Sequence, residues 1–326
     1  MKQAVIAVDI GGTLIRAARL DFDLHIEARD EIPTLADEGF AATLERIKTC
    51  IRRVWPDDHR RVAGIGISMP GPLNPVTGVV ISPPNLTGWL NIPLVELMTT
   101  TFDVPTYIAK DTNAAILAEA LRGAARGFSH IVYITISTGL GGAVIADGRL
   151  LVGTRGMATE VGHMMIIEDG QPIYLEQRTA GPAIERLAYQ RLEKGEQSSL
   201  IDVVGGDLSR LKTRYITRAA TAGDALALEV VQDTGRLIGM GIVNLLHLFN
   251  PEIVVIGGGV SKAGAVLFDA IMKGVHDYCL DDLYWQDLRI EAAALGDDVG
   301  LIGAGILVIA EGDTADIDSL QARWVE

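Results

Sequence analysis

Two stretches of the chain share one pattern of apolar and small residues. Residues 4–21, AVIAVDIGGTLIRAARLD, place one apolar run before a Gly-Gly-Thr turn and another after it. Residues 131–148, IVYITISTGLGGAVIADG, repeat that order in the second part of the chain. Short apolar runs bounded by glycine-rich turns are typical of buried strands. The recurrence therefore predicts two related α/β domains and argues against a solenoid of short repeats.

The remaining apolar pattern predicts further strands and helices in each domain. The predicted strands are residues 62–68 and 105–110, and the predicted helices are residues 38–54, 111–126 with Gly127 beyond the end, and most of 178–249. Residues 251–264 predict a strand, a glycine turn and a helix, and residues 297–312 predict an apolar helix that folds back onto the first domain. We expect a smaller N-terminal α/β domain of residues 1–113 plus about 302–326, and a larger domain of residues 114–301.

Composition narrows the class of protein. The chain has 326 residues, of which 48% are hydrophobic and 21% charged, as in globular proteins with full-sized cores. A net charge of −14 disfavours nucleic acid as a partner. The N-terminal apolar run meets Asp9 and two glycines, which predicts a strand and not a signal peptide, and the longest apolar stretches are too short or too interrupted to span a bilayer. We expect a cytoplasmic enzyme or binding protein with no membrane partner.

Three glycine-rich turns are candidates for binding phosphate. They are DIGGT at residues 9–13, STGLGG at 137–142 and GGG at 257–259. Glycine allows backbone N–H groups to approach an anion closely. None of the three matches a P-loop or a dinucleotide-binding fingerprint. Because two of them fall at equivalent places in the repeated pattern, together they favour a nucleotide bound in a cleft between the domains.

Asp111 has two interpretations. It stands between a predicted strand and a predicted helix, so it is a candidate helix N-cap. It is equally a carboxylate at the end of a strand, placed to take a proton from a hydroxyl during phosphoryl transfer.

Glu160, His163 and Glu176 form a second candidate group, with three interpretations. They could hold a polyol, because sugars need several directional hydrogen-bond partners. They could ligate a metal, although Glu-x-x-His supplies only two donors and no HExxH motif is present. They could also belong to an acidic surface loop.

The motifs in order resemble one known family. DIGGT, SMPGPLNPVTG, PPNLTGWLNIPL, DTNAA, ISTGLGGAVIADGRLLVGTRGMATEVGH, LEQRTAGPAI, NPEIVVIGGGVS and GDDVGLIGAG span almost the whole chain and resemble the ROK family of sugar kinases and sugar-responsive repressors. The resemblance implies a two-domain α/β fold of the actin/hexokinase (ribonuclease H-like) type, with an interdomain cleft and a C-terminal helix that returns to the first domain.

The resemblance also implies roles for individual residues. Asp111 matches the base that activates a sugar hydroxyl to attack the γ-phosphate of ATP. The residues implied for sugar binding are Gly71, Asn85, Lys110, Glu160, His163 and Glu176. Those implied for nucleotide binding are Asp9, Gly11, Gly12, Thr13, Thr138, Gly139, Gly258 and Gly259. Mg²⁺ would accompany ATP near Asp9 and would contact it through water, because magnesium usually keeps several of its waters. Family members usually form homodimers or tetramers.

This sequence departs from the family in the zinc-binding segment. Most members carry CxCGxxGC just after the Gly-His pair, whereas the chain here runs from His163 to Glu176 without a cysteine. Its two cysteines, Cys50 and Cys279, lie far apart. In this segment Glu168 and Asp169 offer only oxygen donors, which are poor substitutes for the soft thiolates of a structural zinc site. We predict that no zinc binds and that Glu168 and Asp169 form a solvated turn.

Three further departures concern single positions. Lys110 stands where many members have an Asn that contacts sugar. Strand alternation would point its side chain away from Asp111. Leu14 replaces a frequent Lys, and Arg16, on the same strand face, could supply that charge. Thr159 replaces the usual Gly before Glu160.

The resemblance favours an ATP-dependent hexokinase that acts on the 6-hydroxyl of glucose. Fructose, mannose, allose, N-acetylglucosamine and N-acetylmannosamine remain open as substrates, and so does polyphosphate as donor, although IGGGVS favours a nucleotide. A repressor is the main alternative. Repressors of the family carry a helix-turn-helix before DIGGT, and here DIGGT begins at residue 9, which leaves no room for one. A non-catalytic sugar sensor is a third reading, and a zinc hydrolase built on Glu160 and His163 lacks an evident third ligand.

Overall fold

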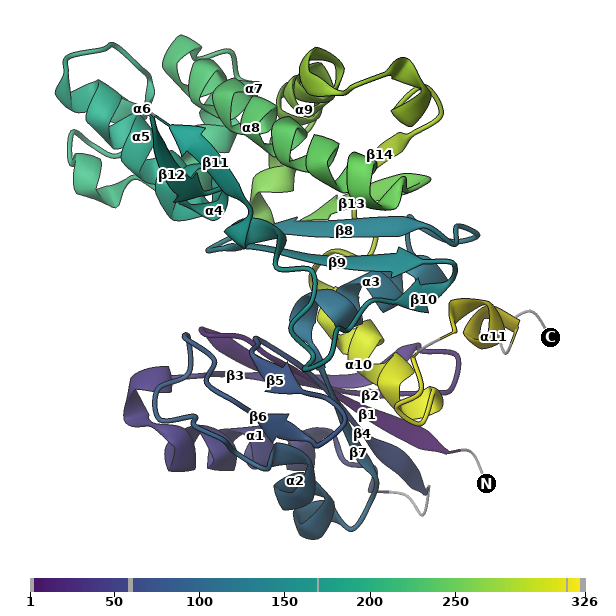
Figure 1. Ribbon diagram of the computed structural model, residues 1–326. Coiled ribbons are helices and arrows are strands. Elements are labelled where there is room, and N and C mark those ends of the chain that lie inside the picture. Colours follow the sequence, from purple (N-terminus) through teal and green to yellow (C-terminus); the bar gives the residue numbers. More distant parts are fainter. Residues whose placement is uncertain (1–2, 58–60, 169, 315, 323–326) are drawn as a thin grey trace. The chain divides into compact units, whose positions relative to one another are not determined.

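The computed structural model describes residues 3–57, 61–168, 170–314 and 316–322 (Figure 1). Asp169, assigned above to a solvated turn, lies outside these residues. The chain forms two compact units. The first contains Met1–Ser129, Asp147–Ala158 and Ala294–Glu326, and the second contains His130–Ala146 and Thr159–Ala293. The domain boundary expected at residue 113 falls inside helix α3 (Asp111–Arg122), which packs against α10 (Val299–Ile309) of the same unit.

The first unit is built on a five-stranded sheet with the order β3-β2-β1-β4-β7. Its strands are β1 (Ala4–Ile10), β2 (Leu14–Leu20), β3 (Ile26–Pro33), β4 (Val62–Met69) and β7 (Thr106–Lys110). Strands β1, β2 and β3 pair antiparallel, whereas β1, β4 and β7 pair parallel. Almost every residue of β1 and β4 is buried, as expected of parallel strands that are covered on both faces.

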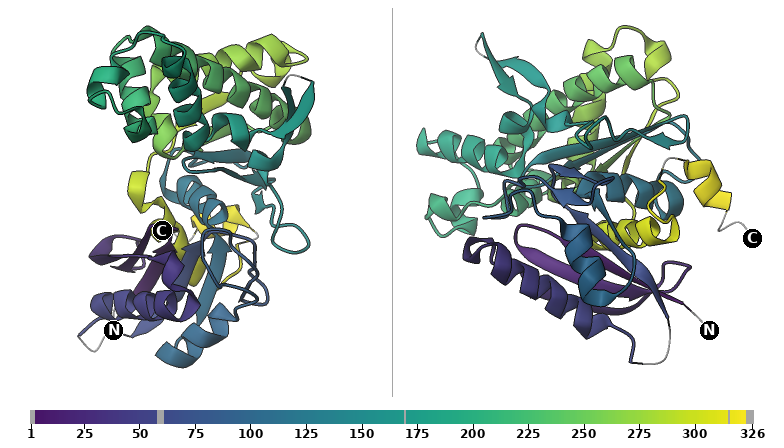
Figure 2. Two further views of the ribbon diagram at one scale, coloured as in Figure 1. Left: turned by 90° about the vertical axis from the view of Figure 1, so that its left-hand side faces the viewer. Right: turned by 60° about the horizontal axis from the view of Figure 1, so that its bottom comes forward.

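Helices cover both faces of this sheet (Figure 1; Figure 2). On one face lie α1 (Phe40–Val54) and α2 (Leu94–Phe102), and on the other lie α3 and α10. Gly66 of β4 allows the close approach of α10, because a Cβ there would lie 1.8 Å from the carbonyl oxygen of Ala304. The smaller elements of the unit are η1 (Ala36–Glu38), β5 (Leu73–Asn74), β6 (Val79–Val80), β10 (Arg149–Leu150), η6 (Gly296–Asp298) and α11 (Ile317–Ala322).

The second unit repeats the strand arrangement of the first. Strands β8 (Ile131–Ile136) and β9 (Leu140–Ala146) pair antiparallel, as β1 and β2 do, and β13 (Ile253–Gly257) pairs parallel to β8, as β4 does to β1. β14 (Arg289–Ala292) adds a further parallel strand beside β13. The repeated strand–turn–strand pattern predicted from the sequence is thereby confirmed.

Helices and one separate hairpin complete the second unit. The hairpin joins β11 (Met165–Glu168) to β12 (Gln171–Tyr174). The helices are α4 (Glu176–Thr179), α5 (Gly181–Glu193), α6 (Leu200–Val203), α7 (Thr213–Thr221), α8 (Ala225–Phe249) and α9 (Ala265–Tyr278), with short 3-10 turns η2 (Val161–His163), η3 (Leu208–Arg210), η4 (Gly259–Ala263) and η5 (Asp282–Tyr284).

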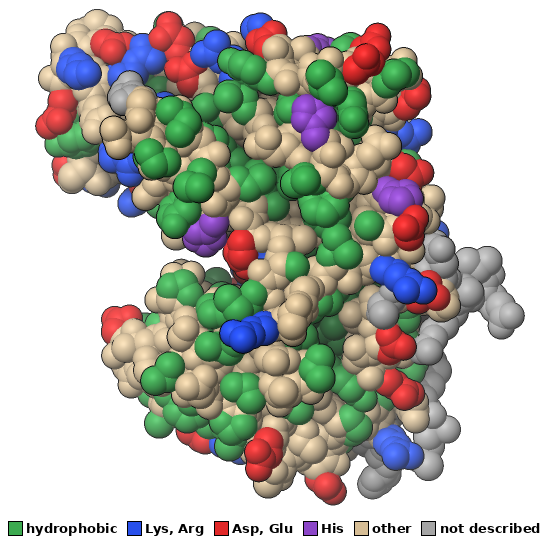
Figure 3. All heavy atoms as spheres, in the orientation of Figure 1, with side chains coloured by type: hydrophobic (Ala, Val, Ile, Leu, Met, Phe, Trp, Pro, Cys, Tyr) green, Lys and Arg blue, Asp and Glu red, His purple; other side chains and the backbone are tan. Residues whose placement is uncertain are grey.

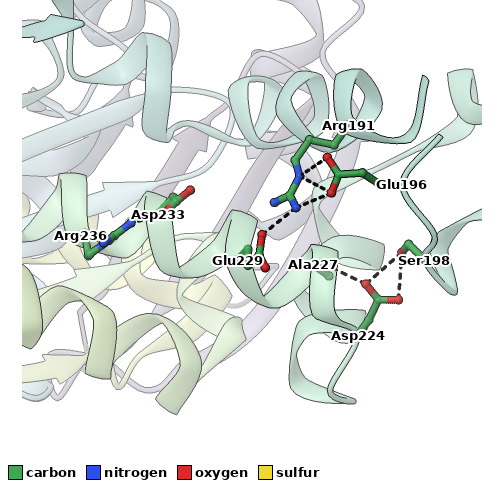
Figure 4. A network of polar contacts seen from close by, with 8 residues as sticks. All are labelled: Arg191, Glu196, Ser198, Asp224, Ala227, Glu229, Asp233 and Arg236. Atoms are coloured by element: carbon green, nitrogen blue, oxygen red, sulfur yellow. Dashed lines mark hydrogen bonds and ion pairs between the residues drawn. The ribbon is translucent and has the colours of Figure 1, made fainter. Parts of the chain in front are cut away.

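Polar contacts join α5 to α8 and fix the start of α8 (Figure 4). Arg191 of α5 donates to Glu196 and to Glu229 of α8. Asp224 is the N-cap of α8, and its carboxylate accepts hydrogen bonds from the N–H of Ala227 and the hydroxyl of Ser198. The bond from Ala227 satisfies one of the backbone donors that a helix start leaves unpaired.

Two features of the described residues bear on partners. None of the helices there is both long enough and apolar enough to span a bilayer. On the face drawn in Figure 3, the described Lys and Arg side chains are interspersed with Asp and Glu and form no continuous basic surface.

Candidate active site

In the first unit, the candidate residues gather where three parallel strands end. Asp9 is the penultimate residue of β1, Ser68 pairs with it in β4, and Ala109 pairs with Ser68 in β7. Lys110 ends β7, and Asp111 follows directly. Because parallel strands present their carboxyl ends at one edge of a sheet, this edge is where ligands of open α/β sheets bind.

Asp111 is the first residue of α3, and Lys110 occupies the N-cap position. The prediction that Asp111 is the N-cap is therefore wrong. The N-cap residue is Lys110, and the Lys110 side chain makes no capping hydrogen bond. Oδ1 of Asp111 accepts a hydrogen bond of 2.7 Å from the N–H of Thr112, and the side chain is exposed. The positive end of the helix dipole favours a negative charge here. An exposed, oriented carboxylate in this place can accept a proton from a hydroxyl.

Asp9 lies in a more buried setting, directly opposite Arg16 in the β1–β2 pairing. Oδ2 of Asp9 is 3.6 Å from the guanidinium of Arg16, and Oδ1 accepts a hydrogen bond of 3.1 Å from the hydroxyl of Ser68. Burial raises the pKa of Asp9 above 3.8, against the lowering effects of Arg16 and Ser68. The positive charge of Arg16 therefore lies beside the carboxylate of Asp9.

The Gly11–Thr13 turn lies against Asn85. The N–H of Gly11 donates to the carbonyl of Leu14, which closes the turn between β1 and β2. A Cβ on Gly12 would lie 3.2 Å from Cβ of Asn85, so the two residues are in close contact. The structure thus brings together a residue implied for phosphate binding and one implied for sugar binding.

Lys110 and Gly71 also lie together. The Lys110 side chain is only 6% exposed, and its Nζ donates to the carbonyl of Ala158 at 3.3 Å. A Cβ on Gly71 would lie 3.5 Å from Cδ of Lys110. The aliphatic part of Lys110 therefore packs beside Gly71.

In the second unit, Glu176 reaches the glycine turn between β8 and β9. Its Oε2 accepts a hydrogen bond of 2.8 Å from the N–H of Leu140. A Cβ on Gly139 would lie 2.6 Å from the same oxygen, so a larger residue there would displace the carboxylate of Glu176. Glu176 and Gly139 are thereby brought together, a contact that the sequence did not reveal.

Glu160 and His163 lie on one short turn. Nδ1 of His163 is 3.6 Å from Oε2 of Glu160, and the two side chains are 55% and 46% exposed. The His163 ring packs edge-on against Tyr174 of the β11–β12 hairpin, with ring centroids 5.1 Å apart. Both side chains are thus accessible to a ligand, and the imidazole is held by an aromatic neighbour.

Thr159 adopts a left-handed backbone conformation, with φ of 61°. This region favours glycine and is unusual for a β-branched residue. The hydroxyl of Thr159 donates to the carbonyl of Gly142 at 3.2 Å. A glycine at this position would adopt the same conformation without strain.

A hollow of about 410 Å³ in the second unit joins the two remaining glycine turns. Thr138 and Gly259 line it, and Gly258 has φ of 86° and lies so close to β8 that a Cβ would be 2.3 Å from the carbonyl oxygen of Ile136. The hollow is also lined by four polar residues that no sequence motif indicated, namely Glu185, Lys212, Thr213 and Arg214.

Glu185 organises that missed segment. Its Oε1 accepts hydrogen bonds from both the N–H and the hydroxyl of Thr213, at 2.7 and 2.9 Å. Because these residues are distant in sequence from every glycine turn, no local motif signals that they belong to the same hollow.

Among the described residues, one group of side chains could supply three ligands to a metal ion. Asp21, Asp23 and His25 could bring three ligand atoms together, in an exposed loop after β2. His163 has no such group around it among the described residues. Glu168, expected in a solvated turn, ends β11 and pairs with Arg178 at 2.5 Å. The absence of zinc stays a prediction.

The two sheet-bearing units define an actin/hexokinase-like fold. The ROK family model matches residues 5–311, and the chain belongs to the ROK family. It is similar to the glucokinase of Thermotoga maritima, at 31% identity over 94% of this chain and 98% of the relative. A ROK family glucokinase from Streptomyces griseus, in complex with glucose and AMPPNP, has a TM-score of 0.81 at 29% identity, covering 93% of this chain and 98% of that one.

The family also contains regulators. The crystal structure of a ROK family transcriptional regulator, a homologue of the E. coli MLC protein, has a TM-score of 0.86 at 27% identity. The match covers 96% of this chain and 80% of that chain. Overall similarity therefore places the chain in the family, and its activity has to be argued from individual residues.

Proposed function

We propose that the protein is a sugar kinase that transfers the γ-phosphoryl group of ATP to the 6-hydroxyl of glucose. The observation that carries the proposal is Asp111, an exposed carboxylate at the positive end of α3 and at the carboxyl edge of the parallel strands. Similarity to glucokinases over nearly the whole chain supports glucose as the sugar and ATP as the donor.

In the proposed reaction, Asp111 orients the sugar hydroxyl and accepts its proton. The hydroxyl oxygen forms a bond to the γ-phosphorus, and the bond from that phosphorus to the bridging oxygen of ADP breaks. Phosphoryl transfer depends more on positioning and charge stabilisation than on a strong base. The hydrogen bond from Thr112 holds the carboxylate in one orientation, which suits this role.

We assign the sugar to the residues that the family resemblance implies for it. Glu160 and His163 present accessible polar groups, and Glu176 is fixed by its bond to Leu140. Asn85, beside the Gly12 turn, would bind the sugar near the transferred phosphate. Lys110 and Gly71 complete the proposed set, in which Lys110 acts from a buried position.

We assign the nucleotide to the glycine turns. Gly11, Gly12 and Thr13 would contact phosphate, and so would Thr138 and Gly139. Gly258 and Gly259 border the hollow of about 410 Å³, which is large enough for part of a nucleotide. Lys212 and Thr213, at its other side, would extend this site.

Magnesium, which would neutralise charge on the phosphates, fits the chemistry of Asp9. Magnesium prefers oxygen ligands and commonly keeps several waters. Asp9 offers a carboxylate that is already engaged by Arg16 and Ser68, and its raised pKa reflects a buried charge that a nearby cation would stabilise. Asp9 would therefore hold the ion through water.

Two alternatives differ from this proposal. Another hexose or an N-acetylhexosamine could be the substrate, because Lys110 replaces a residue that contacts sugar in many members. A sugar-sensing protein without catalysis is the second, favoured by similarity to a family regulator. An ADP-release assay over glucose, fructose, mannose, allose, N-acetylglucosamine and N-acetylmannosamine, with ATP and polyphosphate as donors, separates them. No sugar phosphate with any pair would refute the kinase.

We further propose that the protein is a cytoplasmic homo-oligomer, a dimer or tetramer. A kinase that uses ATP needs a compartment that supplies it. Leu248 near the end of α8, Tyr278 at the end of α9, and Leu280 and Leu283 just after α9 are exposed, and Leu280 is 79% exposed. The N–H of Leu280 donates to Nε2 of His247 at 3.3 Å, which brings the two segments together, and contiguous exposed apolar side chains are typical of contact surfaces between subunits. Light scattering of wild type and of Leu280→Asp tests this, and a wild-type monomer would refute it.

A further inference from the structure

Glu119 is a fully buried carboxylate that has no part in the reaction described above. It lies three residues before the end of α3 and is 0% exposed. A carboxylate near the C-terminus of a helix is disfavoured by the helix dipole, and burying a charge is costly unless it is well hydrogen-bonded. The carboxylate of Glu119 therefore needs hydrogen-bond donors around it.

Three backbone N–H groups supply that compensation. Oε2 of Glu119 accepts from Ala124 at 2.8 Å and from Ala294 at 3.1 Å, and Oε1 accepts from Leu295 at 3.0 Å. Gly123 leaves space for the carboxylate, because a Cβ there would lie 1.9 Å from Oε2. Helix α3 ends at Arg122, earlier than the end just before Gly127 that the sequence predicted.

The segment that Glu119 holds leads directly to Asp9. Residues 294 and 295 precede η6 and α10, and the carbonyl of Asp297 accepts a hydrogen bond of 3.2 Å from Arg16. Gly300, in the first turn of α10, lies so close to Asp9 that a Cβ would be 2.5 Å from Oδ1. If this segment shifted, it would therefore displace Asp9 and Arg16.

The same helix touches the beginning of α3. A Cβ on Gly303 of α10 would lie 2.2 Å from the carbonyl oxygen of Ala114, one turn from Asp111. Close contacts of this kind leave no room for sliding, since protein interiors are densely packed. Glu119 thus ties α3, which carries Asp111, to the helix that packs against Asp9.

We propose that Glu119 is a positioning residue for phosphoryl transfer. Its carboxylate fixes the register between α3 and the 294–300 segment, and so the placement of Asp111 relative to Asp9. The inference rests on the proposed kinase function, because it assigns both carboxylates to one reaction. A misplacement of about 1 Å can reduce a rate about a hundredfold.

Glu119→Gln tests this inference with little change in shape. The glutamine oxygen can keep the bonds from Ala124 and Ala294, but its NH₂ group then faces the N–H of Leu295, so one of the three bonds is lost. We expect kcat to fall about 10- to 100-fold, with KM for glucose nearly unchanged. Hydrogen exchange of the amides at residues 294–300 should become faster.

Two further variants separate positioning from loss of stability. Leu117→Ala removes a fully buried side chain from the same helix and lowers the melting temperature, but leaves the three bonds in place, so kcat should stay at the wild-type value. Gly123→Ala displaces the carboxylate directly and should reproduce the kcat loss of Glu119→Gln. All rates are measured below the melting transitions.

Several outcomes would overturn the inference. One is a wild-type kcat for Glu119→Gln despite a lower melting temperature, and another is an equal kcat loss in Leu117→Ala. Unchanged exchange at residues 294–300 in Glu119→Gln would also overturn it. If the wild type makes no sugar phosphate, the proposed function fails by itself, and the exchange comparison still decides whether Glu119 holds this segment.

Discussion

Asp9 and Arg16 face each other across the antiparallel strands β1 and β2, and their charged groups are 3.6 Å apart. The arrangement compensates a buried carboxylate only in part, because burial still raises the pKa of Asp9 above 3.8. Ionising Asp9 is therefore costly, and a carboxylate held in this way at the ligand-binding edge of a sheet is a candidate functional residue. Two consequences can be measured on one variant.

Asp9→Asn should separate stability from activity. A carboxyl whose pKa is raised by folding contributes stability below its ordinary pKa and loses it as pH rises through the folded value. We therefore expect the melting temperature of Asp9→Asn to increase relative to that of wild type as pH rises above 3.8. Catalytic efficiency with MgATP should fall about 10- to 100-fold, as for other residues that act on a metal through a water.

The comparison of melting temperatures needs a control for the lost charge pair. Arg16→Gln keeps Asp9 but removes its nearest cation, so it should destabilise the protein most at neutral pH, where Asp9 is ionised. A melting temperature of Asp9→Asn that falls relative to wild type with rising pH would contradict this account.

Asp111→Asn should abolish catalysis and leave sugar binding intact. The amide matches the carboxylate in shape but cannot take a proton, so kcat should fall about a hundredfold to ten-thousandfold. Glucose binding, followed by calorimetry, should change little because the side chain keeps an oxygen for the sugar hydroxyl. Glu96→Gln, on α2 and outside the proposed site, serves as the matched control. Near-wild-type turnover in Asp111→Asn would exclude its role as the base.

Thr159 offers a test of backbone strain. Its left-handed conformation costs about 1–2 kcal/mol for a non-glycine residue, and its hydroxyl recovers about 1 kcal/mol through the bond to Gly142. Thr159→Val keeps the strain and loses the bond, so it should lower the free energy of unfolding by about 1 kcal/mol. Thr159→Gly loses the bond but relieves the strain and should be closer to neutral. Equal destabilisation by both substitutions, measured by chemical denaturation, would rule out strain at this position.

The sequence predicted the parts of the fold that follow from local pattern. The apolar runs around DIGGT and STGLGG became the paired strands β1–β2 and β8–β9, because alternation and glycine turns act over a few residues. The start of α3 at Asp111 was likewise predictable. The fold class followed from the order of motifs.

Contacts between distant segments were not predictable in the same way. The bond from Leu140 to Glu176 and the bonds from Ala294 and Leu295 to Glu119 join residues far apart in the chain. They depend on packing, which leaves no periodic signal in one sequence. The φ of Thr159 was hidden for a related reason, since threonine gives no sign that a turn requires the left-handed region.

The missing cysteine cluster predicts protein without zinc. Purified protein should contain well below one zinc per chain by elemental analysis, because the segment from His163 to Glu176 offers no thiolate. Treatment with a chelator should leave the melting temperature unchanged, since a structural zinc site contributes directly to folding. Stoichiometric zinc, lost together with stability on chelation, would contradict this prediction.

Asp224 at the start of α8 predicts a pH-dependent loss of stability. Partial burial acts to raise its pKa, but hydrogen bonds from Ala227, Ser199 and Ser198 outweigh this and lower the pKa below 3.8. A lowered pKa means that the ionised carboxylate contributes stability above 3.8, which is lost as pH falls through the folded value. Asp224→Ala should therefore cost about 1 kcal/mol at neutral pH, the usual value of an N-cap.

The difference between Asp224→Ala and wild type should shrink as pH falls below 3.8, because the wild type then loses the same interactions. Asp224→Asn is the matched control, since asparagine caps a helix about as well as aspartate and carries no titrating group. The free energy of unfolding of Asp224→Asn should be close to that of wild type at neutral pH, and it should depend less on pH than that of wild type. Hydrogen exchange of the amides at residues 225–228 reports the cap directly, and equal exchange in Asp224→Ala and wild type at neutral pH would show that the cap does not hold the helix start.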